Sequence, residues 1–197
     1  MSDIYERQRR YYHLRAAEYD GSSWESSNEG HAVEVAKTIA AVSALPPART
    51  LDVACGTGFL SQHLRGELTL LDASADMLAI AADRVPHARI VQAEAPPLPF
   101  ADASFERVLS SHFYDHLRPP ERETFLAEAR RVGSELVLVQ QTGRPAHREG
   151  DEHRTLDDGT RHVIYKTYFT PESLLAELGG GEVLHEGRWV MVVRASL

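Results

Sequence analysis

The chain has 197 residues, of which 43% are hydrophobic and 25% charged, values typical of a globular domain and not of a disordered or fibrous chain. Its net charge of −8 repels phosphate backbones, so we expect no nucleic acid as partner. Cys55 is the single cysteine, which excludes an intrachain disulfide. The polar N-terminus and the lack of an apolar run near the roughly 20 residues of a membrane span predict a cytoplasmic protein that does not associate with membranes.

Short β-branched apolar runs alternate with helix-like segments along the chain. In chain order we predict a helix around 35–42, strands at 50–54 and 68–71, a helix capped by Ser74, strands at 89–91 and 107–109, a helix opened by Pro119-Pro120, a strand at 135–139, a helix opened by Thr170-Pro171, and strands at 183–184 and 189–193. Near-continuous apolar strands between helices predict a parallel sheet that is covered on both faces. The last two strands, separated only by a turn at Gly187, predict an antiparallel edge. Segments 21–30, 96–104 and 141–167 are expected to be irregular loops.

The sequence Leu51-Asp52-Val53-Ala54-Cys55-Gly56-Thr57-Gly58-Phe59-Leu60 predicts a strand followed by a glycine loop and a helix. Glycines permit positive φ and close approach of the backbone to a ligand. The N-terminus of the following helix would offer free N–H groups and a positive dipole end. A dinucleotide fingerprint would need Gly or Ala at position 61, where this chain has Ser61.

Two acidic residues follow the next strands. Asp72 ends the second predicted strand, where a carboxylate can accept hydrogen bonds from both ribose hydroxyls of a nucleoside. Glu94 follows the third strand, where it could accept from an exocyclic amine. A helix-capping role for Asp72 and a solvated position for Glu94 are the structural alternatives.

These motifs resemble those of the class I S-adenosylmethionine-dependent methyltransferases, in particular the small-molecule branch similar to the ubiquinone/menaquinone-type enzymes. The resemblance covers about positions 11 to 195 and rests on DVACGTGFL, on LLDAS-ADML and on AEAPPLPFADASFERVLSSHFYDHL, with Tyr11-Tyr12-His13 and Ala17-Glu18-Tyr19-Asp20 similar to a tyrosine-rich helix over the cofactor. It implies a Rossmann-like fold with a seven-stranded, mostly parallel sheet, an antiparallel edge hairpin and helices on both faces. It also implies an N-terminal helical lid over residues 1–45 and a cofactor-binding core over 46–197.

The resemblance further implies S-adenosylmethionine as cofactor. The residues it assigns to cofactor binding are Tyr19, Asp52, Ala54, Gly56, Gly58, Asp72, Ala73, Met77, Glu94, Ala95, Ser110 and Ser111. Ala54 departs from the family pattern, which usually has glycine there.

Methyl transfer from a sulfonium needs mainly in-line positioning and exclusion of water, with at most one general base. His116 is the first candidate for that base and His112 the second, since both follow the fourth predicted strand; a packing role is the alternative for each. His147 to His153, with Asp157, Asp158 and His162, match no metal-site spacing, so no metal is expected. Tyr165, Tyr168 and Phe169 are candidate walls for an aromatic acceptor, although Phe169 could equally belong to the core.

We therefore expect an enzyme that methylates a small organic molecule, with oxygen of a phenol, quinol or natural-product intermediate favoured over nitrogen or carbon. A protein of the same fold that binds the cofactor without methylating, or that acts as a cyclase, is one alternative. A nicotinamide-dependent oxidoreductase is another. The expected partner is the small-molecule acceptor, and the expected assembly is a monomer or homodimer.

Overall fold

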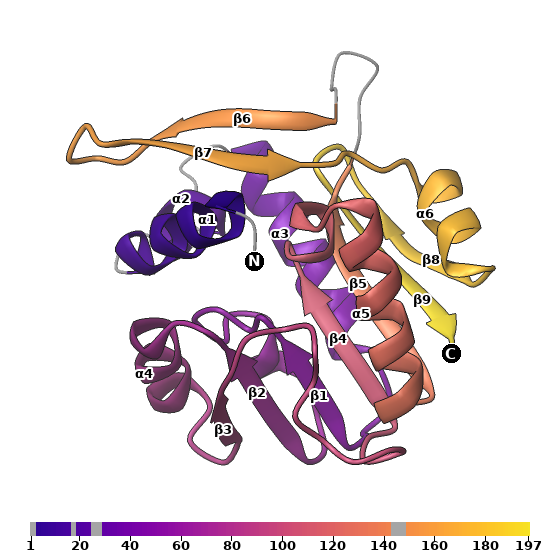
Figure 1. Ribbon diagram of the computed structural model, residues 1–197. Helices are drawn as coiled ribbons and strands as arrows, with labels where there is room; N and C mark the ends of the chain where they lie inside the picture. Colours follow the sequence, from indigo (N-terminus) through magenta and orange to yellow (C-terminus); the bar gives the residue numbers. More distant parts are fainter. Residues whose placement is uncertain (1–2, 17–18, 25–28, 143–148) are drawn as a thin grey trace.

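The computed structural model describes residues 3–16, 19–24, 29–142 and 149–197. Its centre is a seven-stranded sheet with the order β3-β2-β1-β4-β5-β9-β8 (Figure 1). The strands are β1 (Thr50–Val53), β2 (Leu68–Asp72), β3 (Arg89–Gln92), β4 (Arg107–Ser111), β5 (Glu135–Gln141), β8 (Glu182–Glu186) and β9 (Val190–Ser196). The first five pair in parallel, whereas β9 runs antiparallel to both β5 and β8. The predicted mostly parallel sheet with an antiparallel edge is confirmed.

Helices pack on both faces of this sheet because its central strands are apolar on both sides. On β5, Leu136 and Leu138 belong to one core cluster, whereas Val137 and Val139 belong to the other. The first cluster includes residues of α5 (Pro119–Val132) and α6 (Pro171–Leu178), and the second includes residues of α3 (Glu29–Ser43) and α4 (Ala75–Arg84). The carboxyl ends of the parallel strands are thereby left as the open edge.

The predicted helix signals act as expected. The Ser74 side chain accepts from the backbone N–H of Met77 and caps α4. Thr170 forms a capping box at the start of α6, and Gly179 ends that helix with a φ of 85°. None of the described helices combines the length and apolar character that crossing a membrane requires.

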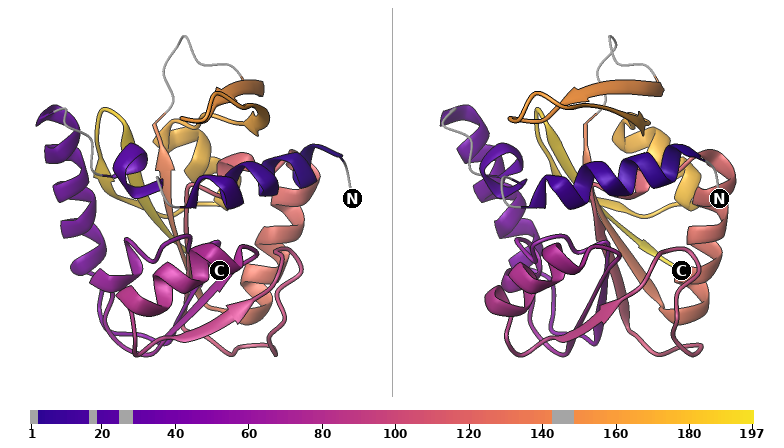
Figure 2. Two further views of the ribbon diagram at one scale, coloured as in Figure 1. Left: turned by 90° about the vertical axis from the view of Figure 1, so that its left-hand side faces the viewer. Right: turned by 60° about the vertical axis from the view of Figure 1, so that its left-hand side comes forward.

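Two N-terminal helices, α1 (Asp3–Leu14) and α2 (Tyr19–Ser23), lie across the carboxyl edge of the sheet, and a hairpin lies above them (Figure 2). The hairpin pairs β6 (Gly150–Thr155) with β7 (Arg161–Lys166). Buried Tyr11 of α1 packs with Leu156 and Ile164 of the hairpin, and the backbone N–H of Tyr165 donates to Gln8 at 3.3 Å. Helix α1 is therefore held between the sheet edge and the hairpin.

This hairpin corrects the expectation that 141–167 is an irregular loop. Strand β6 is composed of polar and charged residues and alternates between half-buried and exposed positions, so it lacks the apolar signal by which strands are recognised. The turn signal Asp158-Gly159 was present, and Gly159 has a φ of 84°.

The prediction of a helix after the glycine loop is also wrong. In its place the chain forms a single 3₁₀ turn, Ser61–His63. The connection from Ala54 to Glu67 is close to the minimum of about a dozen residues for a parallel crossover, which leaves no room for a longer helix. The loop therefore does not present the N-terminus of an α-helix, with its positive dipole end, to a ligand.

Candidate active site

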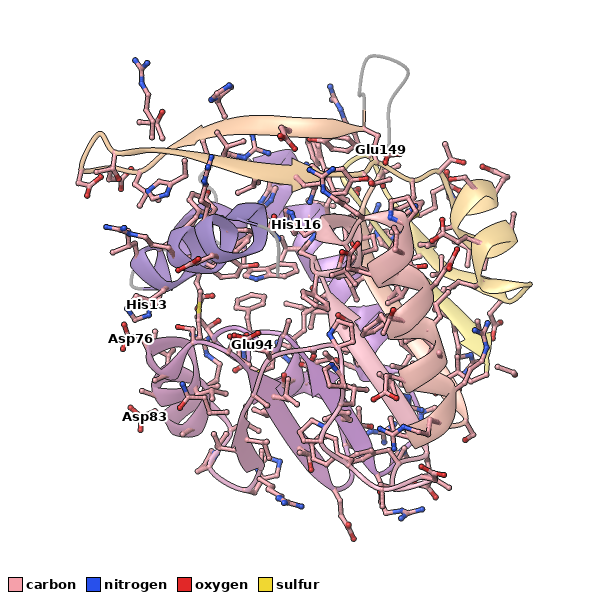
Figure 3. All side chains as sticks on the ribbon, in the orientation of Figure 1. His13, Asp76, Asp83, Glu94, His116 and Glu149 are labelled. Carbon is pink, nitrogen blue, oxygen red and sulfur yellow. The ribbon has the colours of Figure 1, made fainter. Side chains whose placement is uncertain are left out.

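A cavity of about 670 Å³ lies between the carboxyl edge of the sheet and α1. Nine residues predicted to bind the cofactor line it: Tyr19, Ala54, Gly56, Asp72, Ala73, Met77, Glu94, Ala95 and Ser111. Both candidate bases, His112 and His116, line it as well. Glu94 lies on the sheet side of this space and His116 beside α1 (Figure 3). Residues far apart in the sequence are thus brought together because strand ends meet at one edge.

Asp72, at the end of β2, is oriented by the neighbouring backbone. One carboxylate oxygen accepts from the N–H of Gly56 at 2.9 Å and the other from the N–H of Ser74 at 2.9 Å. Each oxygen has a further lone pair for a ligand. Burial raises the pKa of Asp72, and these backbone hydrogen bonds oppose that rise. The site therefore holds a fixed acceptor for a pair of hydroxyl groups.

The glycine loop follows its predicted conformation. Gly56 and Gly58 have φ values of 54° and 70°, in the left-handed region. Ala54 has a φ of 56° despite its Cβ, so alanine adopts there the conformation that favours glycine. All three residues form the turn beneath the cavity, and Ala54 and Gly56 also line it.

Three predicted cofactor residues lie behind the cavity instead of on its wall: Asp52, Gly58 and Ser110. A Cβ on Gly58 would lie 3.3 Å from the Cβ of Ala81, so this glycine permits close packing on α4. The Ser110 hydroxyl donates to the carbonyl of Val53 at 2.9 Å.

Asp52 is buried and accepts a hydrogen bond from the Ser61 hydroxyl at 2.5 Å. Burial raises its pKa to about 7, the Ser61 hydrogen bond lowers it, and the Asp72 charge adds to the rise. This hydrogen bond links β1 to the 3₁₀ turn, so Asp52 stabilises the glycine loop without lining the cavity.

His116 is fixed at both ring nitrogens. Nδ1 lies 2.7 Å from the carbonyl oxygen of Tyr165, which can only accept, so Nδ1 carries the proton. Nε2 then accepts from the Tyr12 hydroxyl at 2.7 Å. Burial lowers the pKa of His116 to about 3, and Lys166 lowers it further against the opposing charge of Asp115. Its basic lone pair is therefore already used within the protein.

His112 differs from His116 because no described residue hydrogen-bonds to its ring. It has a φ of 51°, and its ring lies 5.2 Å from that of Trp24. Burial and the charge of Lys166 lower its pKa to about 4, so the ring is neutral near pH 7. His112 therefore presents a neutral ring, with a lone pair that no described residue uses, to the cavity wall.

A second cavity, of about 1020 Å³, adjoins the first. Tyr12, Tyr19, His112 and His116 line both cavities. The second one extends between the hairpin, α1 and the ends of β5 and β9, where its lining includes Arg154, Lys166, Gln141 and Trp189. The site consequently has two compartments that meet at the two histidines.

Sequence reasoning missed two contacts of this site. The resemblance puts Tyr12 in a tyrosine-rich helix over the cofactor but gives no partner for its hydroxyl. Its hydrogen bond to His116 spans 104 positions of sequence, which no local pattern encodes. Lys166 was not singled out; its ammonium pairs with fully buried Asp115 at 2.5 Å.

The proposed aromatic walls are not confirmed by the placement of those side chains. Tyr165, Tyr168 and Phe169 line neither cavity: Phe169 belongs to the main core cluster, and the Tyr168 hydroxyl donates to Glu152 at 2.6 Å. Ala17, Glu18 and His147 lie outside the described residues. Among the residues that are described, no three His, Cys, Asp or Glu side chains are grouped as a metal site.

Residues 51–135 match the family described as methyltransferase domain. A demethylmenaquinone methyltransferase of Renibacterium salmoninarum is 37% identical over 51% of this chain and 44% of its own length. A ubiquinone/menaquinone biosynthesis C-methyltransferase of Bordetella avium is 31% identical over 66% of this chain and 55% of its own length. The chain thus spans about half the length of these curated relatives.

Among solved structures, the DhpI-SAM-HEP complex superposes on this chain with a TM-score of 0.81 at 23% sequence identity, and the match covers 99% of each of the two chains. At this level of identity the likeness concerns the fold, which is the class I methyltransferase fold.

Proposed function

We propose that this chain, whose residues 51–135 match a methyltransferase domain and whose fold is that of the class I methyltransferases, binds S-adenosylmethionine and transfers the methyl group to a small organic acceptor. The observation that carries the proposal is the first cavity, where Asp72, the positive-φ loop around Gly56 and the buried side chain of Met77 meet. The Ser111 hydroxyl on its wall is buried and has no partner among the described residues, as expected for a group that serves a ligand.

The residues present fit this cofactor. Asp72 would accept the ribose hydroxyls, Ala73 and Met77 would flank the adenine, and Glu94 with Ala95 would face its edge. Gly56 and Ser111 would lie near the amino-acid end. Asp52, Gly58 and Ser110 would act indirectly, because they hold the glycine loop and β4 in place.

When bound, the cofactor supplies an activated methyl on a sulfonium, so the protein needs mainly to align the acceptor and exclude water. We place an oxygen nucleophile at the junction of the two cavities. His112 would take its proton, because that ring is neutral and its lone pair is not used by a described residue. His116 would position Tyr12 at the same junction.

The segment 1–45 would act as the lid over the cofactor in this proposal. Within it, α1 and α2 supply side chains that line both cavities, whereas α3 contributes His31 to the second cavity alone and packs its Val35 and Val42 into the core. The lid function therefore rests on α1 and α2.

Calorimetric titration with S-adenosylhomocysteine and S-adenosylmethionine tests the cofactor assignment. We expect micromolar-range binding that Asp72→Ala weakens by about 1.5–3 kcal/mol, the cost of losing hydrogen bonds to a charged group. Asp83→Ala, which removes an exposed carboxylate of α4 outside both cavities, is the matched control and leaves the affinity unchanged.

If the folded wild-type protein binds neither nucleoside, the proposal is contradicted, and nicotinamide cofactors are the next ligands to titrate. If binding is found, product mass separates the remaining alternatives: methylation adds about 14 Da to the acceptor, whereas a cyclase of this fold adds nothing.

A further inference from the structure

A buried ion pair joins strand β7 to the 3₁₀ turn Tyr114–His116, which follows β4. The Lys166 ammonium lies 2.5 Å from Oδ2 of Asp115, and the backbone N–H of Thr167 donates to the carbonyl of Asp115 at 2.7 Å. Asp115 is fully buried and Lys166 is 5% exposed, so water screens neither charge. The hairpin therefore brings a positive charge to the turn that carries His116.

Asp115 lies between two groups that can each carry a positive charge. Its Oδ2 pairs with Lys166, whereas its Oδ1 has no hydrogen-bond partner among the described residues. This unpartnered oxygen lies 3.7 Å from Nε2 of His116, which is too long for a hydrogen bond. Nε2 accepts instead from the Tyr12 hydroxyl at 2.7 Å. One carboxylate is thus within reach of both Lys166 and His116, and in this structure it pairs with the lysine.

The protonation state of His116 sets the direction of its hydrogen bond with Tyr12. The neutral ring carries its proton on Nδ1 and accepts at Nε2. An imidazolium has a proton on each nitrogen and accepts at neither. Its Nε2–H would donate toward the unpartnered oxygen of Asp115, and the Tyr12 hydroxyl could no longer donate to the ring. Because Tyr12 belongs to α1, the charge on His116 decides whether this hydrogen bond holds α1 in place.

The charges around His116 act in opposite directions. Burial has the largest effect on its pKa and lowers it; Lys166 has the next largest effect and also lowers it, whereas Asp115 raises it. An opposite charge within about 4–6 Å favours the charged form of a titratable group. Without the ammonium, Asp115 would be the dominant charge acting on His116. The other titratable groups that face the two site histidines or act on them are Tyr12 and Arg15 of α1, Tyr19 of α2, His31 of α3 and Tyr165 of β7.

We propose that Lys166 is a positioning residue of the lid: by pairing with Asp115 it keeps His116 neutral, so that Tyr12 donates to His116 and α1 stays over the first cavity. The inference deepens the proposed function, because α1 forms a wall of the proposed cofactor site. When the ammonium is removed, a proton from solvent binds Nε2 of His116, and the imidazolium becomes the new partner of the Asp115 carboxylate. No other bond changes in this step.

The test records the ring ¹⁵N chemical shifts of His116 in the full, ligand-free chain at pH 5.5. The ring should be neutral in wild type and mostly imidazolium in Lys166→Gln. Lys166→Gln combined with Asp115→Asn removes both charges and should restore the neutral ring. Arg161→Gln is the matched control, because it removes an exposed cation from the same strand outside both cavities and should leave the ring neutral.

A second measurement follows the hydrogen bond itself. At pH 5.5, Tyr12→Phe should lower the midpoint of urea denaturation in the wild-type background. In the Lys166→Gln background the same substitution should shift the midpoint less than half as far, because an imidazolium does not accept from Tyr12. The full shift should return when Asp115→Asn is added to Lys166→Gln. A purely structural role of Lys166 would leave the three shifts equal.

A neutral His116 ring in folded Lys166→Gln overturns the inference, because Asp115 then does not draw a proton onto the ring. If Lys166→Gln is unfolded while the variant that also carries Asp115→Asn folds, His116 does not replace the lysine as partner, and the inference is also wrong. It is equally wrong if both variants are unfolded, because the ion pair then acts on folding and not on the histidine.

The titration with S-adenosylhomocysteine is read separately. Since the histidine spectra are recorded without ligand, they decide the inference whether or not the nucleoside binds. A nucleoside that binds to a chain in which Lys166→Gln leaves His116 neutral overturns this inference alone and leaves the proposed function standing.

Discussion

The Tyr12 hydroxyl of α1 and Nε2 of His116, which follows β4, lie 2.7 Å apart and join the N-terminal helix to the carboxyl edge of the sheet. His116 is 2% exposed, so its nitrogen has no alternative partner in solvent. Tyr12→Phe should lower the free energy of unfolding by about 1–3 kcal/mol, because it leaves a buried acceptor without a donor. Tyr11→Phe, on the neighbouring buried ring, is the control and should have a smaller effect. Urea denaturation of both variants measures this difference, and equal effects would contradict it.

The two site histidines should resist protonation. Their folded-state pKa values are lowered, to about 4 for His112 and about 3 for His116, because both rings are buried near Lys166. Ring ¹⁵N chemical shifts, assigned with His112→Asn and His116→Asn, should therefore be those of neutral imidazole at pH 5.5. A protonated ring at that pH would show that burial does not control these groups.

The same shifts set the sign of a stability change. Below the unfolded-state pKa of about 6.5, the unfolded chain binds protons that the folded state does not. Each histidine therefore contributes stability that is present above that pH and is lost at about 1.4 kcal/mol per pH unit as the pH falls toward its folded-state pKa. Removing either ring with asparagine should make the decline in the free energy of unfolding between pH 6 and 5 less steep.

Asp52 should have the opposite effect. Its pKa is raised to about 7 by burial, so between its unfolded value of 3.8 and that pH the folded state holds the extra proton, and stability falls as pH rises. Asp52→Asn keeps an acceptor for Ser61 but removes the titration. The stability of this variant relative to wild type should increase by about 1.4 kcal/mol per unit between pH 5 and 6.5. Denaturation curves at several pH values measure it; a constant difference would contradict it.

Gly58 should tolerate no side chain. Gly58→Ala would combine a φ of 70° with a Cβ only 3.3 Å from that of Ala81, and should cost about 2 kcal/mol or more. Gly159→Ala, at a φ of 84° in the hairpin turn with open space around it, is the control and should cost about 1 kcal/mol. Thermal or urea denaturation compares them, and equal losses would exclude the packing contribution.

The sequence predicts the central sheet well, because its central strands are apolar on both faces and each main helix has a local start or stop signal, as at Ser74 and Thr170. The outer strands β3 and β8 are only partly buried. The sequence does not predict β6, whose residues are polar on both faces and whose pairing with β7 replaces burial as the reason for its strand conformation. The sequence predicts the backbone conformation of the glycine loop but not the segment that follows it. Local propensity favours a helix there, whereas the short crossover between β1 and β2 limits Ser61–His63 to a single turn.

The candidate site likewise contains residues that the sequence predicts and contacts that it does not. Asp72, Gly56 and Met77 lie in the cavity because consecutive strand ends meet at one edge, which chain order alone implies. The relative suitability of His112 and His116 depends on contacts with Tyr12 and Tyr165, and these come from segments whose docking is tertiary. Sequence position favoured His116, whereas the hydrogen-bond partners favour His112.

Because the two cavities share Tyr12, Tyr19, His112 and His116, a molecule in one compartment contacts the walls of the other. Occupancy of the first should therefore change affinity in the second, and by thermodynamic linkage the reverse change must be equal in size. Steady-state kinetics should accordingly show interdependent Michaelis constants for the two substrates, and product inhibition patterns should reveal a preferred order of addition.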